Sequence, residues 1–195
     1  MRITPPHKME NFQSFLAANF EFNPEETQQI LNCFEKKTLK KGAYFLTEGQ
    51  YCKTVAFVEK GGFFFYQLMD GEEKVCDFAF EGDWISQYKS LINNLPSELS
   101  IKALVDSEIY WLDATAMDKL SDKVPKVLII RTKLAEQYFT QSAERADKLA
   151  TLKAEERYQW LLDSHPKIHQ RVPQYYIASY LGIKPQSLSR IRAVK

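Results

Sequence analysis

The sequence has 195 residues, enough chain for one large domain or two small ones with a buried core. Apolar residues make up 45% and charged residues 26%, which is typical of a soluble globular protein and excludes disordered and collagen-like classes. No run approaches the roughly 20 apolar residues of a membrane span, and the first residues lack the apolar core of a secretory signal. A cytoplasmic protein with no membrane contact is therefore expected.

The formal net charge of +1 hides an uneven distribution along the chain. Residues 1–117 carry 11 basic and 17 acidic side chains, whereas residues 118–195 carry 15 basic and 8 acidic ones. No acidic residue follows Asp163, although six lysines and arginines do. This asymmetry predicts an acidic module joined to a basic module that binds a polyanion.

Cysteine and histidine limit the chemistry that the chain can support. The three cysteines (Cys33, Cys52 and Cys76) are widely spaced and form no Cys-x-x-Cys pair, so neither a disulfide framework nor a zinc knuckle is expected. No histidine lies between Lys8 and Ser164, which excludes a His-ligated metal or a Ser-His pair from that stretch. Pro166 interrupts the pair His165 and His169, and no further ligand is near. No metal, cofactor or enzymatic activity is predicted.

The first predicted elements are two helices. Phe12, Phe15, Leu16 and Phe20 are spaced like one face of a helix. Asn23 can cap a second helix, with Pro24 in the first helical position and Glu26 completing a capping box. We expect this second helix to end near Lys36.

From Thr38 to Asp113, short apolar or alternating runs are separated by glycine turns. Asp70-Gly71 lies between two β-prone runs and predicts a tight hairpin, because a type I′ turn needs positive φ at both central residues. Several short strands without intervening helices indicate an antiparallel barrel or sandwich. The expected strands are Tyr44–Leu46, Val55–Glu59, Phe63–Leu68, Glu73–Phe80, Trp84–Ile85, Leu99–Leu104 and Glu108–Leu112.

After Asp113 the pattern becomes helical. Thr115 and Asp118 resemble a capping box, and residues 126–149 contain neither glycine nor proline. Such a helix would be about 36 Å long, so that pairing with a second copy of the chain is expected, the alternative being packing along the β-domain. A third helix is expected over Ala154–Ser164. The apolar seam of the long helix would comprise Val127, Ile130, Leu134, Tyr138 and Phe139, followed by Ala143, Ala146 and Leu149.

The stretch from Val172 to Arg192 has the spacing of a helix-turn-helix. Ala178 is small where the two helices would approach, and Gly182 can supply the positive φ of the turn. Pro185 suits the first turn of the second helix. Inward-facing side chains would be Ile177, Leu181, Ile183, Leu188 and Ile191.

The outward face of this second helix contains no carboxylate. Arg190 and Gln186 are expected to contact bases, because their forked groups match guanine and adenine edges in the major groove. Ser189 lies on the same face. Phosphate contacts, which orient a protein without reading sequence, are expected from Lys184, Ser187, Arg192 and Lys195.

The predicted β-roll, long helix and helix-turn-helix, together with five short segments, resemble the Crp/Fnr family of bacterial transcription regulators. KGAYFLTEG at residues 41–49 and VAFVEKG at 55–61 are similar to the early strands of a cyclic-nucleotide-binding domain. ERY at residues 156–158, IASYLGI at 177–183 and SLSR at 187–190 are similar to the DNA-binding end of that family.

The resemblance implies an α+β fold with an antiparallel β-roll, a long dimerisation helix and a C-terminal helix-turn-helix. The β-roll sensor domain with its N-terminal helices would span residues 1–117, the dimerisation helix 118–150 and the DNA-binding domain 151–195. The implied partners are double-stranded DNA, a second copy of the chain and RNA polymerase. The family's recognition helix is usually followed by a β-hairpin wing, and none is evident before Lys195.

The sequence departs from the family where cyclic nucleotides bind. The family's Gly-Glu-Leu element becomes Gly82-Asp83-Trp84, and Ser97, beside Glu98, stands in place of the phosphate-binding arginine. Losing a charge-assisted donor and gaining a carboxylate disfavours a cyclic phosphate. Three scattered cysteines do not supply an iron–sulfur cluster, and a β-roll without histidine does not support haem sensing. Candidate residues for a different effector, if there is one, are Phe64, Phe78, Phe80, Gly82, Asp83, Trp84, Tyr88 and Ser97.

Two other functions fit parts of the pattern. A ligand-binding β-roll sensor could act through a protein partner instead of DNA. A cupin-like enzyme would share the β-roll architecture, but the missing histidines argue against it.

Overall fold

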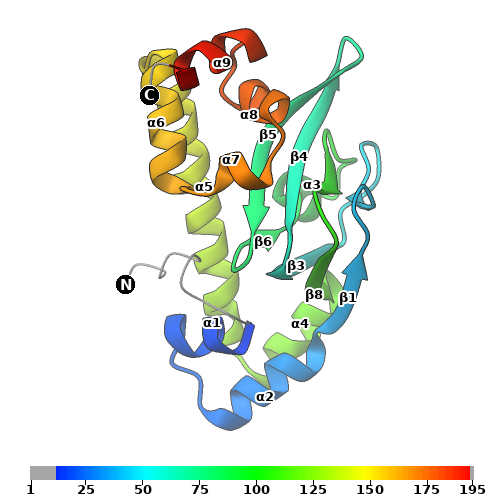
Figure 1. The fold of residues 1–195 in the computed structure, drawn as a ribbon. Helices are drawn as coiled ribbons and strands as arrows, with labels where there is room; N and C mark the ends of the chain where they lie inside the picture. Colours follow the sequence, from blue (N-terminus) through cyan, green and yellow to red (C-terminus); the bar gives the residue numbers. More distant parts are fainter. Residues whose placement is uncertain (1–11, 194–195) are drawn as a thin grey trace. The chain divides into compact units, whose positions relative to one another are not determined.

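The computed structural model (Figure 1) describes residues 12–193. These residues divide into two units. The first unit holds the described residues up to Phe65 together with Phe78–Glu136. The second holds Tyr66–Asp77 and the described residues from Gln137 onward. The outer part of a β-hairpin therefore groups with the C-terminal helices.

Two helices begin the described chain, as predicted: α1 (Phe12–Asn19) and α2 (Pro24–Cys33). The capping box is confirmed, since the Asn23 side chain accepts from the Glu26 amide at 2.8 Å and Glu26 accepts from the Asn23 amide at 2.9 Å. Helix α2 ends before the expected Lys36. Strand β1 (Glu35–Leu39) begins there and pairs with β8 (Ser107–Asp113) at the edge of a sheet.

The predicted antiparallel β-roll is confirmed as two four-stranded sheets. One has the order β1-β8-β3-β6 and the other β2-β7-β4-β5. Asp70 and Gly71 join β4 to β5 with φ of 53° and 79°, as the hairpin signal predicted. A short helix α3 (Tyr88–Asn93), which was not predicted, follows β6. The remaining strands are β2 (Tyr44–Leu46), β3 (Thr54–Lys60), β4 (Gly62–Met69), β5 (Glu72–Phe80), β6 (Trp84–Ile85) and β7 (Ser100–Ala103).

Helix α4 (Ala114–Lys123) begins at a different cap from the one expected. The Thr115–Asp118 capping box was wrong: the N-cap is Asp113, whose carboxylate accepts from the Thr115 amide at 2.8 Å and its hydroxyl at 2.6 Å. These two hydrogen bonds lower the pKa of Asp113. Asp118 instead pairs with Arg131 on the surface.

The core of the first unit lies where the N-terminal helices meet the β-roll and the start of α5 (Val127–Thr151). Val127 and Ile130 are fully buried in this core, so these two members of the expected dimer seam pack within their own chain. Buried side chains of the core include Phe12, Phe15, Leu16, Ile30, Phe57, Leu112, Leu120, Val127 and Ile130.

The second unit contains the rest of α5 and four shorter helices. Helix α7 was not predicted, whereas α6, α8 and α9 lie where the sequence placed them. Within the described residues, no helix combines the length and apolarity needed to cross a membrane. The four helices are α6 (Ala154–Ser164), α7 (Ile168–Arg171), α8 (Gln174–Tyr180) and α9 (Pro185–Ala193).

Candidate nucleic-acid interface

Helices α8 and α9 form the predicted helix-turn-helix. Gly182 adopts φ of +66° in the turn, as expected, and the Ile183 amide donates to the Ala178 carbonyl at 3.0 Å. Ala178 and Leu188 are completely buried between the helices. The small residue, the left-handed glycine and the buried leucine thus fix the crossing of α8 and α9.

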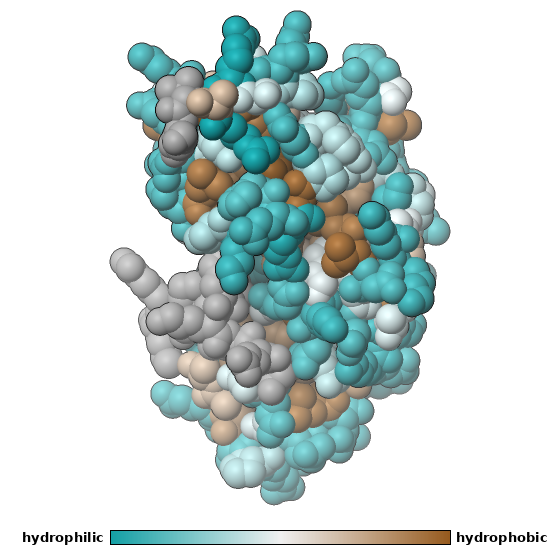
Figure 2. Space-filling model, in the orientation of Figure 1, coloured by the Kyte–Doolittle hydropathy of each residue, from teal (hydrophilic) through white to brown (hydrophobic). Residues whose placement is uncertain are grey.

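The predicted DNA-contacting side chains of α9 and the preceding turn face away from this core. Gln186 and Arg190 are one helical turn apart and therefore share a face. Figure 2 shows strongly hydrophilic residues over the end of the molecule where α9 lies. Lys195 lies outside the described residues. Ser187 is half-buried, and the exposed members of the set are Lys184, Gln186, Ser189, Arg190 and Arg192.

The two guanidinium groups of α9 make only long contacts with their own unit. Arg190 donates to the Ser187 hydroxyl and Arg192 to the Gln174 side chain, each at 3.5 Å. Hydrogen bonds at this distance are weak. Both cations are therefore available for a phosphate or a base edge, and α9 carries no carboxylate that would repel DNA.

Aromatic and cationic side chains support the C-terminal end of α8. Arg145 on α5 lies 4.6 Å from the centre of the Tyr180 ring and donates to the Tyr180 carbonyl at 3.4 Å. Trp160 on α6 stacks on the same ring at 6.3 Å between centroids. Burial is the main reason that the pKa of Tyr180 lies above its usual value. These contacts anchor the helix-turn-helix on α5 and α6.

Sequence reasoning missed a further set of residues beside α8. The Tyr176 hydroxyl donates to the Glu73 carboxylate at 2.7 Å, and the Val75 amide donates to the Ser179 hydroxyl at 2.9 Å. Glu73 and Val75 lie on β5, more than 100 residues earlier in the chain. No local pattern signals such a contact, because it depends on the tertiary arrangement.

The aromatic candidates for an effector site are divided between the two sheets. Phe78 lies on β5 and stacks with Phe80 at 6.4 Å, whereas Trp84 lies on β6 in the other sheet. The Trp84 ring packs edge-on against Phe34 and Phe57 in the helical core. Phe64 is buried on β4 and Tyr88 begins α3. The structure therefore does not gather this set around Trp84.

The residues that stand in place of the family's nucleotide-binding elements form hydrogen bonds with nearby backbone groups. The Asp83 carboxylate accepts from the Phe80 amide at 2.8 Å, and the buried Gly82 amide donates to the Val58 carbonyl at 2.9 Å. The Ser97 hydroxyl donates to the Leu99 carbonyl at 2.6 Å. The sequence has no arginine between Arg2 and Arg131. Consequently the β-roll lacks the bidentate donor that a cyclic phosphate would need.

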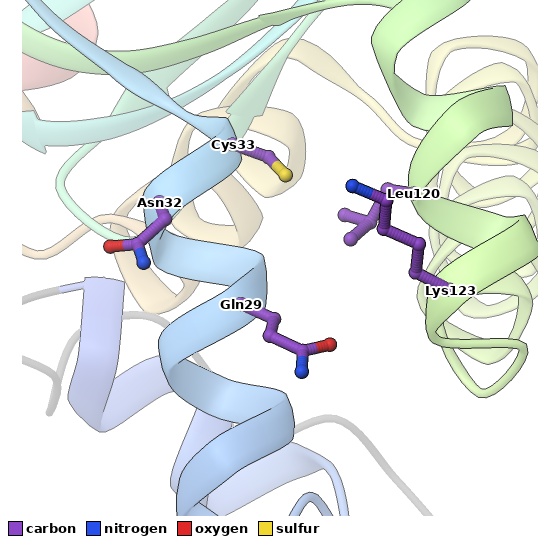
Figure 3. Close-up of a pocket in the computed structure, with 5 residues that line it drawn as sticks. All are labelled: Gln29, Asn32, Cys33, Leu120 and Lys123. Carbon is purple, nitrogen blue, oxygen red and sulfur yellow. The ribbon is translucent and has the colours of Figure 1, made fainter.

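One cleft lies elsewhere, between α2 and α4 (Figure 3). Gln29 and Cys33 of α2 point toward Leu120 and Lys123 of α4. None of the predicted effector residues lines it. In the described part of the chain, no group of three histidine, cysteine or carboxylate side chains is arranged to hold a metal ion.

Comparisons with known proteins agree with this architecture. Residues 36–123 match the family model of the cyclic nucleotide-binding domain. No curated protein matches the sequence significantly.

Three solved structures share the fold over most of their length. The c-di-GMP responsive global regulator CLP from Xanthomonas campestris is 15% identical, with 88% of this chain and 91% of that chain covered at a TM-score of 0.70. The catabolite activator protein of Thermus thermophilus is 18% identical, with 89% and 84% covered at 0.58. A proposed regulator of the Crp/Fnr family from Eubacterium rectale is 18% identical, with 89% and 83% covered at 0.66. Residues 36–123 are thus similar to the cyclic nucleotide-binding domain, and the described chain has the fold that these solved structures of regulators share.

Proposed function

We propose that this chain is a DNA-binding transcription regulator of Crp/Fnr type. The observation that carries the proposal is the exposed, carboxylate-free face of α9, on which Gln186 and Arg190 are adjacent. Helix α9 would enter the major groove, where the side chains of glutamine and arginine match adenine and guanine edges. Lys184 and Arg192 would contact phosphates.

The proposed regulator reads its operator as a dimer. Two copies of α9, held about 34 Å apart, would enter successive major grooves of a pseudo-palindrome. Phe139 on α5 is 75% exposed and Tyr138 is 49% exposed, an unusual amount of apolar surface for a helix facing water. Pairing of α5 with a second copy would cover both residues. RNA polymerase is the partner on which such a regulator would act.

The proposed regulator responds to an effector other than cyclic AMP or has none. Ser97 and Asp83 are committed to hydrogen bonds within their loops, and Glu98 pairs with Lys89 at 2.6 Å. No arginine lies in this part of the sequence to bind a cyclic phosphate. The regulator therefore responds to another molecule or binds DNA without one.

The test of the proposal separates base reading from phosphate contact. After selection of bound duplexes from a random DNA pool, Arg190→Ala is expected to lose about 1–3 kcal/mol of binding free energy at one base position only. Lys184→Ala should weaken binding by a similar factor on every sequence. Titrations measure the affinity of both variants for the selected duplex and for duplexes with single-base substitutions, and so distinguish base reading from phosphate contact. Equal loss on operator and random DNA for Arg190→Ala would show that this residue does not read a base.

A further inference from the structure

The outer part of the β4–β5 hairpin contacts the first helix of the helix-turn-helix. We call residues 66–77 the hairpin tip; they belong to the same unit as α8 and α9. The inner parts of β4 and β5, up to Phe65 and from Phe78, belong to the β-roll unit. The two strands thus connect the β-roll covalently to a segment that is packed on the DNA-reading unit.

Three hydrogen bonds join the hairpin tip to α8. Tyr176 donates its hydroxyl to the Glu73 carboxylate at 2.7 Å. Ser179, one turn further on, accepts from the Val75 amide at 2.9 Å and donates to the Glu73 carbonyl at 3.2 Å. Burial, followed by hydrogen bonds with Tyr175 and Glu73, raises the pKa of Tyr176. The contact thus has defined donors and acceptors, one of them charged, which makes it stronger than a chance surface contact.

The contact uses a face of α8 that the helix-turn-helix does not need for its own fold. Ile177, Ala178 and Leu181 are buried, and their spacing places them on one side of the helix. Tyr176 and Ser179 lie on the other side of the helix, three residues apart. Releasing the hairpin tip would therefore leave the packing of α8 against α9 intact.

The charge of the hairpin tip indicates that its contact with α8 weakens the binding of a polyanion. Residues 137–195 carry a formal net charge of +5, whereas the hairpin tip carries −3, with acidic groups at Asp70, Glu72, Glu73 and Asp77 and a single Lys74. Residues 137–195 together with the docked hairpin tip therefore carry a net charge of +2, compared with +5 for residues 137–195 alone. A polyanion binds a basic surface less tightly when carboxylates are added to it.

We infer that the hairpin tip is an autoinhibitory latch on the helix-turn-helix. The latch holds α8 through Tyr176 and Ser179 and weakens DNA binding until the hairpin is released. Because β4 and β5 continue into the β-roll, a change in the position of either strand is transmitted directly to the latch. This inference rests on the proposed DNA binding.

The first variant tests the latch without changing charge or ring size. Tyr176→Phe removes the donor to Glu73 and leaves Ser179 in place. Hydrogen exchange at the Val75 amide then reports docking, because its acceptor is unaltered. We expect exchange at Val75 to accelerate about tenfold, the loss for one hydrogen bond to a charged group, and DNA affinity to rise about 3- to 10-fold. Unchanged protection at Val75 would show that the tip is not held by this bond.

A second variant controls for the case in which Tyr176→Phe disturbs the fold of α8. Ser179→Ala removes the other latch hydrogen bonds but places a better helix former in α8. It should raise DNA affinity to a similar extent as Tyr176→Phe.

Two matched substitutions on the hairpin tip distinguish the effect of the hydrogen bond to Tyr176 from the effect of removing one negative charge. Glu72→Gln removes an exposed carboxylate that pairs with Lys74, and Glu73→Gln removes the one that accepts from Tyr176. Both variants change the net charge equally, so the inference requires Glu73→Gln to raise affinity more. Equal effects, or weaker DNA binding by the Tyr176 and Ser179 variants, would overturn it. If neither the native chain nor any variant bound DNA even at low salt, the proposed function itself would fail, whatever exchange at Val75 showed.

Discussion

Gly182 sets the angle between α8 and α9, because its left-handed backbone redirects the chain within one residue. A side chain added there would meet only Arg157, at 3.6 Å, so there is space for it. The requirement for glycine is therefore conformational and not steric.

Substitution of Gly182 tests this requirement at the residue scale. Gly182→Ala is expected to lower the free energy of unfolding by about 1–2 kcal/mol, the cost of a left-handed conformation for an L-residue. Gly182→Asn should lose less, because asparagine tolerates that region. Urea unfolding measures both, with Ser189→Ala on the exposed face of α9 as the control. An alanine variant as stable as the native chain would contradict the account.

At the same scale, the sequence predicted residues whose conformation depends on near neighbours. Asn23 with Glu26, Asp70 with Gly71, and Gly182 were all found from short patterns and are confirmed. The Thr115 cap failed because Asp113 is also a good N-cap residue two positions earlier, and periodicity does not choose between them.

Elements with a clear hydrophobic period were predictable, whereas those stabilised by their neighbours were not. Strand β1 has the sequence EKKTL, which has no apolar alternation, and is stabilised by pairing with β8. Helix α7 has only four residues. Propensity is a weak signal for such short segments, since tertiary context stabilises them.

The exposed part of α5 yields a prediction at this scale. Phe139→Lys is expected to convert the proposed dimer to a monomer at micromolar concentration, because each copy would lose the burial of a phenylalanine, worth about 1.5–3 kcal/mol. Sedimentation measures the association. Gln141→Lys, which adds the same charge on the opposite side of the helix, should leave the dimer intact. A monomeric native chain, or equal effects of the two lysines, would exclude this seam.

At the scale of the whole molecule, the two sheets and the helix-turn-helix followed from the order of elements along the chain. The contact of the hairpin tip with α8 did not, because Glu73 and Tyr176 are 103 positions apart in the sequence. The structure shows where the acidic and basic parts of the sequence come together. The acidic hairpin tip belongs to the same unit as the basic C-terminal helices, so acidic and basic residues meet in the unit that contains the helix-turn-helix.

The salt dependence of DNA binding shows whether the helix-turn-helix contacts DNA phosphates as proposed. Lys184 and Arg192 from each copy of a dimer would contact four phosphates, so the logarithm of the association constant should fall with the logarithm of salt concentration with a slope of about −3.6 or steeper. Lys184→Ala should reduce the magnitude of that slope by about 1.8, since each dimer loses two contacts. A flat slope, or no binding to DNA at low salt by a correctly folded chain, would contradict the account.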